Sequence, residues 1–119
     1  ALDKGIIVVL DRYSDSTLAY QGYAGDIPID TIENMNSFAT LDIKPDITFI
    51  LDIAIEEGLK KSGCKDRIEK KGLEYHARVR DGYYRLAEKF PKRICLIKVK
   101  EDYLDTQQEI RGIFQSRFI

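Results

Sequence analysis

Three short apolar runs limit most strongly what this chain can fold into. They cover residues 6–10, 47–51 and 94–99, and the first two are rich in β-branched residues that barely alternate with polar ones. Such runs are typical of parallel strands that are buried on both faces. Helical patterns follow them, which indicates βα units. The sequence therefore predicts an α/β fold with a parallel sheet flanked by helices.

Start and stop signals divide the rest of the chain into helices and loops. Ser, Thr or Asp followed three residues later by Glu forms a capping box, and Pro ends a helix. The predicted helices are a short one capped by Ser14 or Asp15 and running through Tyr20, one opened by Asp30 with Glu33, one over 73–90 that stops at Pro91, and one opened by Thr106 with Glu109. Residues 21–28 and 60–71 read as loops.

Composition excludes several classes of function. The formal net charge is −1, whereas a general binder of nucleic-acid phosphates needs a basic excess, so no nucleic-acid partner is expected. No apolar run approaches the ~20 residues that span a bilayer, so no membrane partner is expected. Cys64 and Cys95 stand apart without metal-type spacing. Free thiols favour a cytoplasmic protein.

The residues that follow the first apolar run are the first candidates for chemistry. Ligands of open α/β sheets bind beyond the carboxyl ends of the strands, and Asp11-Arg12-Tyr13 stands there. An acid and an Arg in that place can hold a metal-bound water and a phosphate. A plainer interpretation is that Asp11 caps the next turn and Arg12 is solvated. These three residues alone favour the plainer one.

The longer context changes this balance. The chain continues to Gly22 as Ser-Asp-Ser-Thr-Leu-Ala-Tyr-Gln-Gly, and the segment 11–22 resembles the signature of the thymidylate kinase family. Further segments match in order: Lys-Pro-Asp-Ile-Thr-Phe-Ile-Leu-Asp at 44–52, Gly-Leu-Lys at 58–60, Asp-Arg-Ile-Glu at 66–69 and Leu-Glu-Tyr-His-x-Arg-Val-Arg-x-Gly-Tyr at 73–83. The resemblance covers essentially the whole chain.

This resemblance implies a fold and an activity. The fold is that of P-loop NTPase-like nucleoside monophosphate kinases, here incomplete, with residues 1–119 as the C-terminal part of a single domain and a lid at about 60–71. The activity is phosphorylation of dTMP to dTDP with ATP and Mg²⁺, in a cytoplasmic enzyme that is a homodimer. Alternatives are a related nucleoside or deoxynucleoside monophosphate kinase, and a non-catalytic remnant that binds nucleotide or a partner.

The resemblance also implies roles for individual residues. It places Arg12 on the dTMP phosphate and Asp11 beside the phosphates and the metal. It makes Arg67 the lid arginine that reaches the transferring phosphate, so Asp11, Arg12 and Arg67 are the expected catalytic residues. The expected dTMP-binding residues are Arg12, Ser16, Thr17, Tyr20, Gln21, Asp66 and Glu69, and the expected lid bases are Lys60, Lys61, Lys65 and Arg67. His76, Tyr83 and Tyr84 are interpreted as packing residues.

The sequence departs from the family pattern in two ways. No Gly-x-x-x-x-Gly-Lys, the loop that cradles ATP phosphates, occurs in it. Residues 1–5 read as the last turn of a helix stopped by Gly5, so we expect a further N-terminal segment of the same protein, continuous with this chain or cleaved from it, to carry that loop. A truncated gene is the alternative. The chain alone is then expected to be inactive and to lack the central strand of its sheet. The lid is also poor in Arg, and Lys offers a point charge rather than a fork.

Overall fold

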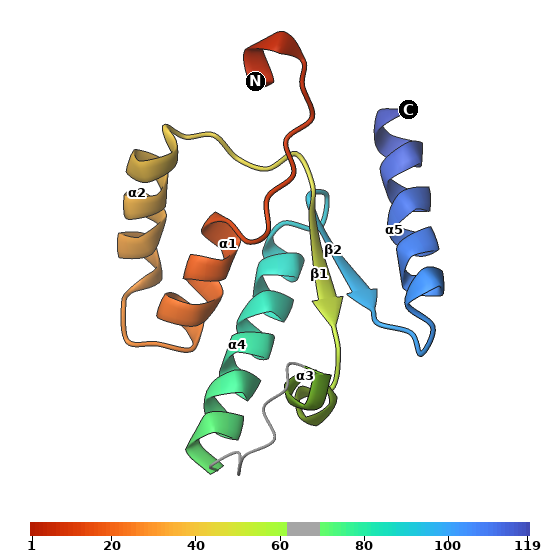
Figure 1. The fold of residues 1–119 in the computed structure, drawn as a ribbon. Helices are drawn as coiled ribbons and strands as arrows, with labels where there is room; N and C mark the ends of the chain where they lie inside the picture. Colours follow the sequence, from red (N-terminus) through yellow and green to blue (C-terminus); the bar gives the residue numbers. More distant parts are fainter. Residues whose placement is uncertain (62–69) are drawn as a thin grey trace.

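The structure is a computed structural model that describes residues 1–61 and 70–119 (Figure 1). Its elements follow one another as η1 (Leu2–Lys4), α1 (Ser14–Thr17), η2 (Leu18–Tyr23), α2 (Ile29–Thr40), β1 (Thr48–Asp52), α3 (Ile55–Lys61), α4 (Lys70–Lys89), β2 (Ile94–Lys98) and α5 (Tyr103–Phe118). The architecture is α/β, as the sequence predicts. No helix in the described part of the chain is long and apolar enough to cross a membrane.

The sheet is parallel, and its strands coincide with two of the predicted runs. β1 pairs with β2 in the register Thr48↔Ile94 to Asp52↔Lys98. α3 and α4 lie between the two strands in sequence, as a parallel connection requires. The predictions of strands at 47–51 and 94–99 are confirmed.

The prediction of a strand at 6–10 is wrong for this structure. These residues lead from η1 toward α1 without strand assignment, and their side chains are between 46% and 87% exposed. A strand exists only through ladder hydrogen bonds to a neighbour, and no strand in the described residues pairs with this segment. The family resemblance puts the phosphate-loop strand beside it, and these 119 residues contain no such loop.

The helices α2, α4 and α5 lie close to where the sequence predicts them, but their caps differ from the predictions. α3 is not predicted, and α3 and α4 occupy the two ends of the stretch 60–71 that is predicted to be a loop. α4 confirms the helix predicted over 73–90. α2 begins one residue before Asp30, which therefore lies inside the first turn and caps nothing. α5 is capped by Asp102, whose carboxylate accepts from the backbone N–H two residues on at 2.9 Å. Thr106 is buried inside α5, where its hydroxyl accepts from the backbone N–H of Lys100 at 2.9 Å. Tertiary contacts override a local capping pattern here.

The first helical segment also differs from its prediction. Tyr13, not Ser14 or Asp15, is the residue before α1, and it makes no side-chain cap. The helix then continues as a π-helical turn, η2, which ends at Tyr23. The predicted loop at 21–28 is therefore helical at its start. π-helical turns are rare in proteins, and those that occur are often found at functional sites.

The helices form layers around the sheet (Figure 1). α5 packs on β2 from one side and α4 from the other, and α4 in turn packs on η2. The core lies along α4 and contains the buried side chains Leu18, Ala19, Ala24, Ile32, Ile50, Val79, Leu86, Ala87 and Ile94. Gly82 allows the close approach of α4 and η2, because a Cβ there would lie 2.6 Å from Cβ of Tyr23.

Candidate functional site

Arg12 lies directly above the ring of Tyr20. Its guanidinium carbon is 5.2 Å from the ring centroid, which is the geometry of a cation–π contact. The backbone of Arg12 has φ of +68°, a left-handed conformation that costs a residue with a Cβ about 1–2 kcal/mol. Such strain persists only where the surroundings hold it, and it concentrates at functional sites. Arg12 is exposed to solvent.

Tyr20 is held from two sides by aromatic rings of α4. The centroid of Tyr75 is 6.3 Å away at an interplanar angle of 60°, and that of Tyr83 is 6.4 Å away at 82°. The hydroxyl of Tyr75 also donates to the backbone carbonyl of Tyr20 at 3.2 Å. The contact with Tyr83 is edge-to-face, an arrangement that stabilises a ring pair beyond the area it buries. Tyr20 itself is half-buried, and Arg12 lies over its ring.

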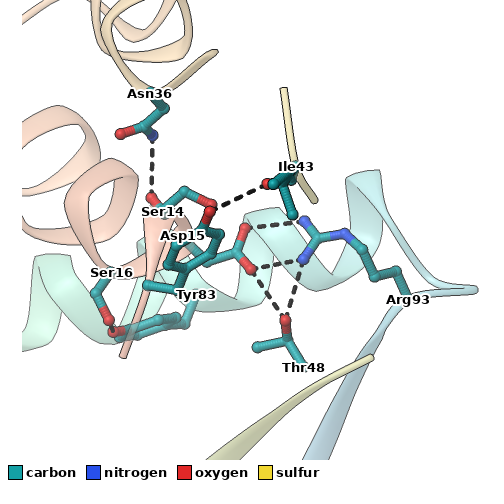
Figure 2. Close-up of polar contacts among 9 residues, drawn as sticks. Ser14, Asp15, Ser16, Asn36, Ile43, Thr48, Tyr83 and Arg93 are labelled. Carbon is teal, nitrogen blue, oxygen red and sulfur yellow. Dashed lines mark hydrogen bonds and ion pairs between the residues drawn. The ribbon is translucent and has the colours of Figure 1, made fainter. Parts of the chain in front are cut away.

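Ser16 connects α1 to the same aromatic group. Its Oγ and the hydroxyl of Tyr83 are 2.9 Å apart, and either can donate (Figure 2). Burial raises the pKa of Tyr83 above its ordinary value of 10.0. The interpretation of Tyr83 as a packing residue is thus incomplete, because the side chain also orients Ser16.

Asp15 anchors α1 to the sheet through contacts that the sequence analysis missed. The buried carboxylate accepts from both terminal nitrogens of Arg93, at 2.6 and 2.9 Å. It also accepts from the hydroxyl of Thr48 at 3.1 Å (Figure 2). Thr48 begins β1, and Arg93 directly precedes β2. Nothing local in the sequence pairs residues 78 positions apart, although an Asp inside a helix with no capping role is a weak signal of a tertiary partner.

A second ion pair lies at the carboxyl end of β1. Asp52 receives two hydrogen bonds from Arg80, at 2.8 and 3.2 Å, and one from the hydroxyl of Tyr84. The bond from Arg80 holds the pKa of Asp52 below its ordinary range. These partners occupy the carboxylate, so Asp52 has a structural contact with α4 rather than a free catalytic oxygen.

A hollow of about 500 Å³ lies beyond the carboxyl ends of the two strands. Ile53 and Val99, which directly follow β1 and β2, form its floor, and its other lining residues are Glu57, Lys61, Lys100 and Glu101. This is the edge at which open α/β sheets bind nucleotides. Of the two lysines in this lining, Lys100 forms an ion pair with Glu109 at 2.9 Å. Lys61 forms no ion pair with the described residues.

The remaining predicted site residues are exposed or lie outside the described residues. Asp11, Thr17 and Gln21 are exposed, and their side chains make no hydrogen bond or ion pair to described residues. Lys60 and Lys61 end α3 and are exposed. The expected positions Lys65, Asp66, Arg67 and Glu69 lie outside the described residues. Within residues 1–61 and 70–119 no three acidic, His or Cys side chains gather in a way that could hold a metal ion.

Comparisons with known proteins agree on one family. The family model for thymidylate kinase matches residues 1–110. A thymidylate kinase of Thermoanaerobacter sp. (strain X514) is 38% identical over 112 residues, which is 92% of this chain and 55% of the relative. That of Sulfurihydrogenibium sp. (strain YO3AOP1) is 39% identical over 120 residues, covering 100% of this chain and 59% of the relative.

A solved structure gives the same answer for the fold. The crystal structure of thymidylate kinase from Ehrlichia chaffeensis is similar with a TM-score of 0.76 and 34% identity, over 96% of this chain and 53% of that one. The chain thus spans little more than half the length of these relatives. On the match of the family model, the identities and the shared fold, the chain belongs to the thymidylate kinase family.

Proposed function

We propose that this chain carries the dTMP-binding side of a thymidylate kinase that transfers the γ-phosphoryl group of ATP to dTMP and forms dTDP. The observation that carries the proposal is Arg12 lying above the ring of Tyr20, which Tyr75 and Tyr83 hold in place. A nucleotide needs a cationic fork for its phosphate and a flat surface for its sugar. Arg12 supplies the fork and the ring of Tyr20 supplies the flat surface, with the guanidinium carbon 5.2 Å from the ring centroid.

Arg12 is the proposed ligand of the dTMP phosphate. Its exposed guanidinium can donate two parallel hydrogen bonds to phosphate oxygens, and the strained backbone fixes the direction from which it does so. Ser16 and Thr17 on α1 and Gln21 on η2 line the proposed approach to the base, as the family resemblance implies.

Tyr20 is the proposed surface for the deoxyribose. A ring held by two neighbouring rings does not move aside for a 2′-hydroxyl, so the site selects the deoxynucleotide by steric exclusion. Its hydroxyl is not needed for this selection, because the excluded volume belongs to the ring.

Asp11 is the proposed carboxylate beside Mg²⁺. Mg²⁺ keeps several waters and takes one or two carboxylates plus phosphate oxygens, so a single exposed carboxylate without a protein partner in the described residues fits that chemistry. When bound, Mg²⁺ supplies positive charge to the phosphates during transfer. Asp11 would orient it through a bound water, and the hollow beyond β1 and β2 would accept the ATP side.

Further parts of the proposal rest on the family resemblance. Arg67 would reach the transferring phosphate from the lid at about 60–71, with Lys60, Lys61 and Lys65 as its other bases, and Asp66 and Glu69 would bind near the sugar. We propose a cytoplasmic homodimer in which residues 1–119 are the C-terminal part of one domain. These 119 residues contain no phosphate-binding loop, so by themselves they are proposed to be inactive.

A coupled assay of ADP formation tests the proposal. The whole gene product that includes this chain is supplied with ATP, Mg²⁺ and dTMP, or with UMP or dCMP in place of dTMP. Formation of ADP that depends on dTMP supports the proposed function. Preference for another monophosphate indicates a related kinase, and nucleotide binding without ADP formation indicates a non-catalytic remnant.

Tyr20→Ala tests the assignment within the site. Removing the ring opens space for a 2′-hydroxyl, so the ratio of kcat/KM for dTMP over ribothymidine monophosphate should fall by about tenfold, the size of a steric term of roughly 1.4 kcal/mol. Tyr20→Phe is the matched control, because it keeps the ring and should keep the ratio. An unchanged ratio in Tyr20→Ala, with a lower melting temperature, would reduce Tyr20 to a packing residue.

A further inference from the structure

We propose that the buried Asp15–Arg93 ion pair is a positioning device for dTMP, which holds α1 so that Arg12 and Ser16 on either side of Asp15 keep their orientation. The inference rests on the proposed function, and it assigns a role to Asp15, Arg93 and Thr48 that the motif comparison does not suggest.

The contacts of Asp15 are saturated. Its side chain is 7% exposed, both carboxylate oxygens accept from Arg93, and one also accepts from Thr48. The hydroxyl of Thr48 in turn accepts from Arg93 at 3.1 Å, and the backbone N–H of Thr48 donates to the carbonyl of Arg93 at 2.9 Å. Asp15 therefore has no oxygen free for a ligand, and any effect on the nucleotide must pass through its neighbours in the chain.

The helix that carries Asp15 cannot hold itself in place. α1 has four residues, continues into the six residues of η2, and has no side-chain N-cap, whereas isolated helices shorter than about 12 residues are marginal in water. Its other side-chain contacts are the amide of Asn36, which donates to the carbonyl of Ser14 at 3.1 Å, and the Ser16–Tyr83 bond (Figure 2). The direction of α1 is therefore set by its tertiary anchors, of which the Asp15–Arg93 pair is the one with paired charges.

A chain of contacts leads from this anchor to the proposed dTMP site. Ser16, next to Asp15, is 2.9 Å from the hydroxyl of Tyr83, and the ring of Tyr83 stands edge-on to Tyr20 at 6.4 Å. Arg12 lies over the same Tyr20 ring, with its guanidinium carbon 5.2 Å from the centroid. A tilt of α1 would displace Ser16 and the strained backbone of Arg12 together.

A gain in stability alone does not explain the presence of this buried ion pair. Two buried charges pay a desolvation cost that a hydrophobic pair of the same size avoids, so a buried ion pair is weak evidence for a gain in stability. Its bidentate form fixes the relative orientation of both side chains. That property suits an anchor which must set the angle of a short helix.

Asp15→Asn in the whole gene product is the principal test. The substitution keeps the size of the side chain but removes its charge and turns an amide NH₂ toward Arg93. We expect the KM for dTMP to rise by about tenfold or more, as misplaced binding groups produce, and the preference for dTMP over ribothymidine monophosphate to fall. The KM for ATP should stay within about twofold, because ATP binds elsewhere. Arg93→Lys, which keeps the charge but loses the fork, should change the same quantities in the same direction by less.

Two matched variants separate positioning from stability. Asp81→Asn removes the carboxylate of an exposed ion pair with Arg85 on α4 and should leave every constant unchanged. Ile97→Val removes a methyl group from a side chain that is 1% exposed in β2, which lowers the melting temperature away from the site. If Asp15→Asn and Arg93→Lys lower the melting temperature but, like Ile97→Val, leave the dTMP KM and the sugar preference unchanged, the pair is structural only and the inference is wrong. Absence of dTMP-dependent activity in the wild type instead refutes the proposed function itself.

Discussion

Replacing Asp52 by Asn should destabilise the protein by an amount that depends on pH. The carboxylate receives two hydrogen bonds from Arg80 and one from Tyr84, and Asn keeps only one oxygen to accept them. Asp52 is 8% exposed, but Arg80 is 43% exposed and still sees water. Exposed pairs contribute about 0–1 kcal/mol and breaking buried ones costs about 3–5, so we expect a loss of about 1–2 kcal/mol at pH 7.

The stabilisation by this cluster of Asp52, Arg80 and Tyr84 should decrease at both acid and alkaline pH. The bond from Arg80 lowers the pKa of Asp52 from its ordinary value of 3.8, so the folded protein resists its protonation more than the unfolded chain does. This contribution is complete above that ordinary value and disappears as pH falls through the folded pKa. The bond to Asp52 raises the pKa of Tyr84 from 10.0. That contribution is complete below pH 10.0 and is lost as pH rises through the folded value.

Urea unfolding followed by circular dichroism measures this difference. Wild type and Asp52→Asn are compared in the whole gene product from pH 7 down to pH 3, with Asp81→Asn as the control. The control removes an exposed pair on the same helix and should cost no more than about 0.5 kcal/mol. A loss for Asp52→Asn below about 0.5 kcal/mol at pH 7, or one that does not shrink below about pH 4, would refute the reasoning.

Three further outcomes are expected. Arg12→Ala should lower kcat/KM for dTMP by at least ~30-fold, since removing one partner of a desolvated Arg–phosphate pair costs about 2–5 kcal/mol; steady-state kinetics within threefold of wild type would contradict its role. Leu86→Ala, at a side chain 1% exposed, should cost about 2–5 kcal/mol in urea unfolding, and a loss under about 1 kcal/mol would show that the site collapses freely. The 119-residue chain expressed alone should aggregate, because residues 6–10 leave apolar side chains exposed; a soluble monomer with a cooperative melting transition would overturn this.

The sequence predicts best those elements whose pattern and partner both lie in the chain. The runs at 47–51 and 94–99 become β1 and β2 because each finds the other. The run at 6–10 is entirely apolar and rich in β-branched residues, but it finds no ladder partner among the described residues. A pattern of β-branched residues therefore predicts the tendency to form a strand, while pairing decides whether the strand forms.

The candidate site shows the same division between local and distant information. Arg12, Ser16 and Tyr20 could be found because they lie in one short motif. Arg93 could not, because its bond to Asp15 joins residues 78 positions apart and no local rule pairs them. The positive φ of Arg12 could not be predicted from the sequence either, because the surroundings impose a left-handed conformation on a residue other than Gly.

The motif is one continuous stretch of sequence, whereas the residues that hold it in place are far from it in the sequence. Residues 11–22 carry the groups proposed to touch dTMP, yet this stretch contains a strained backbone, a helix of four residues and a π-helical turn. None of these is stable alone. The strain at Arg12, about 1–2 kcal/mol, must be offset by contacts from elsewhere, and the contacts observed come from α4 through Tyr75 and Tyr83 and from the start of the sheet through Arg93. A substitution at these distant supports should alter recognition of the nucleotide as surely as one within the motif, although no short motif would identify them.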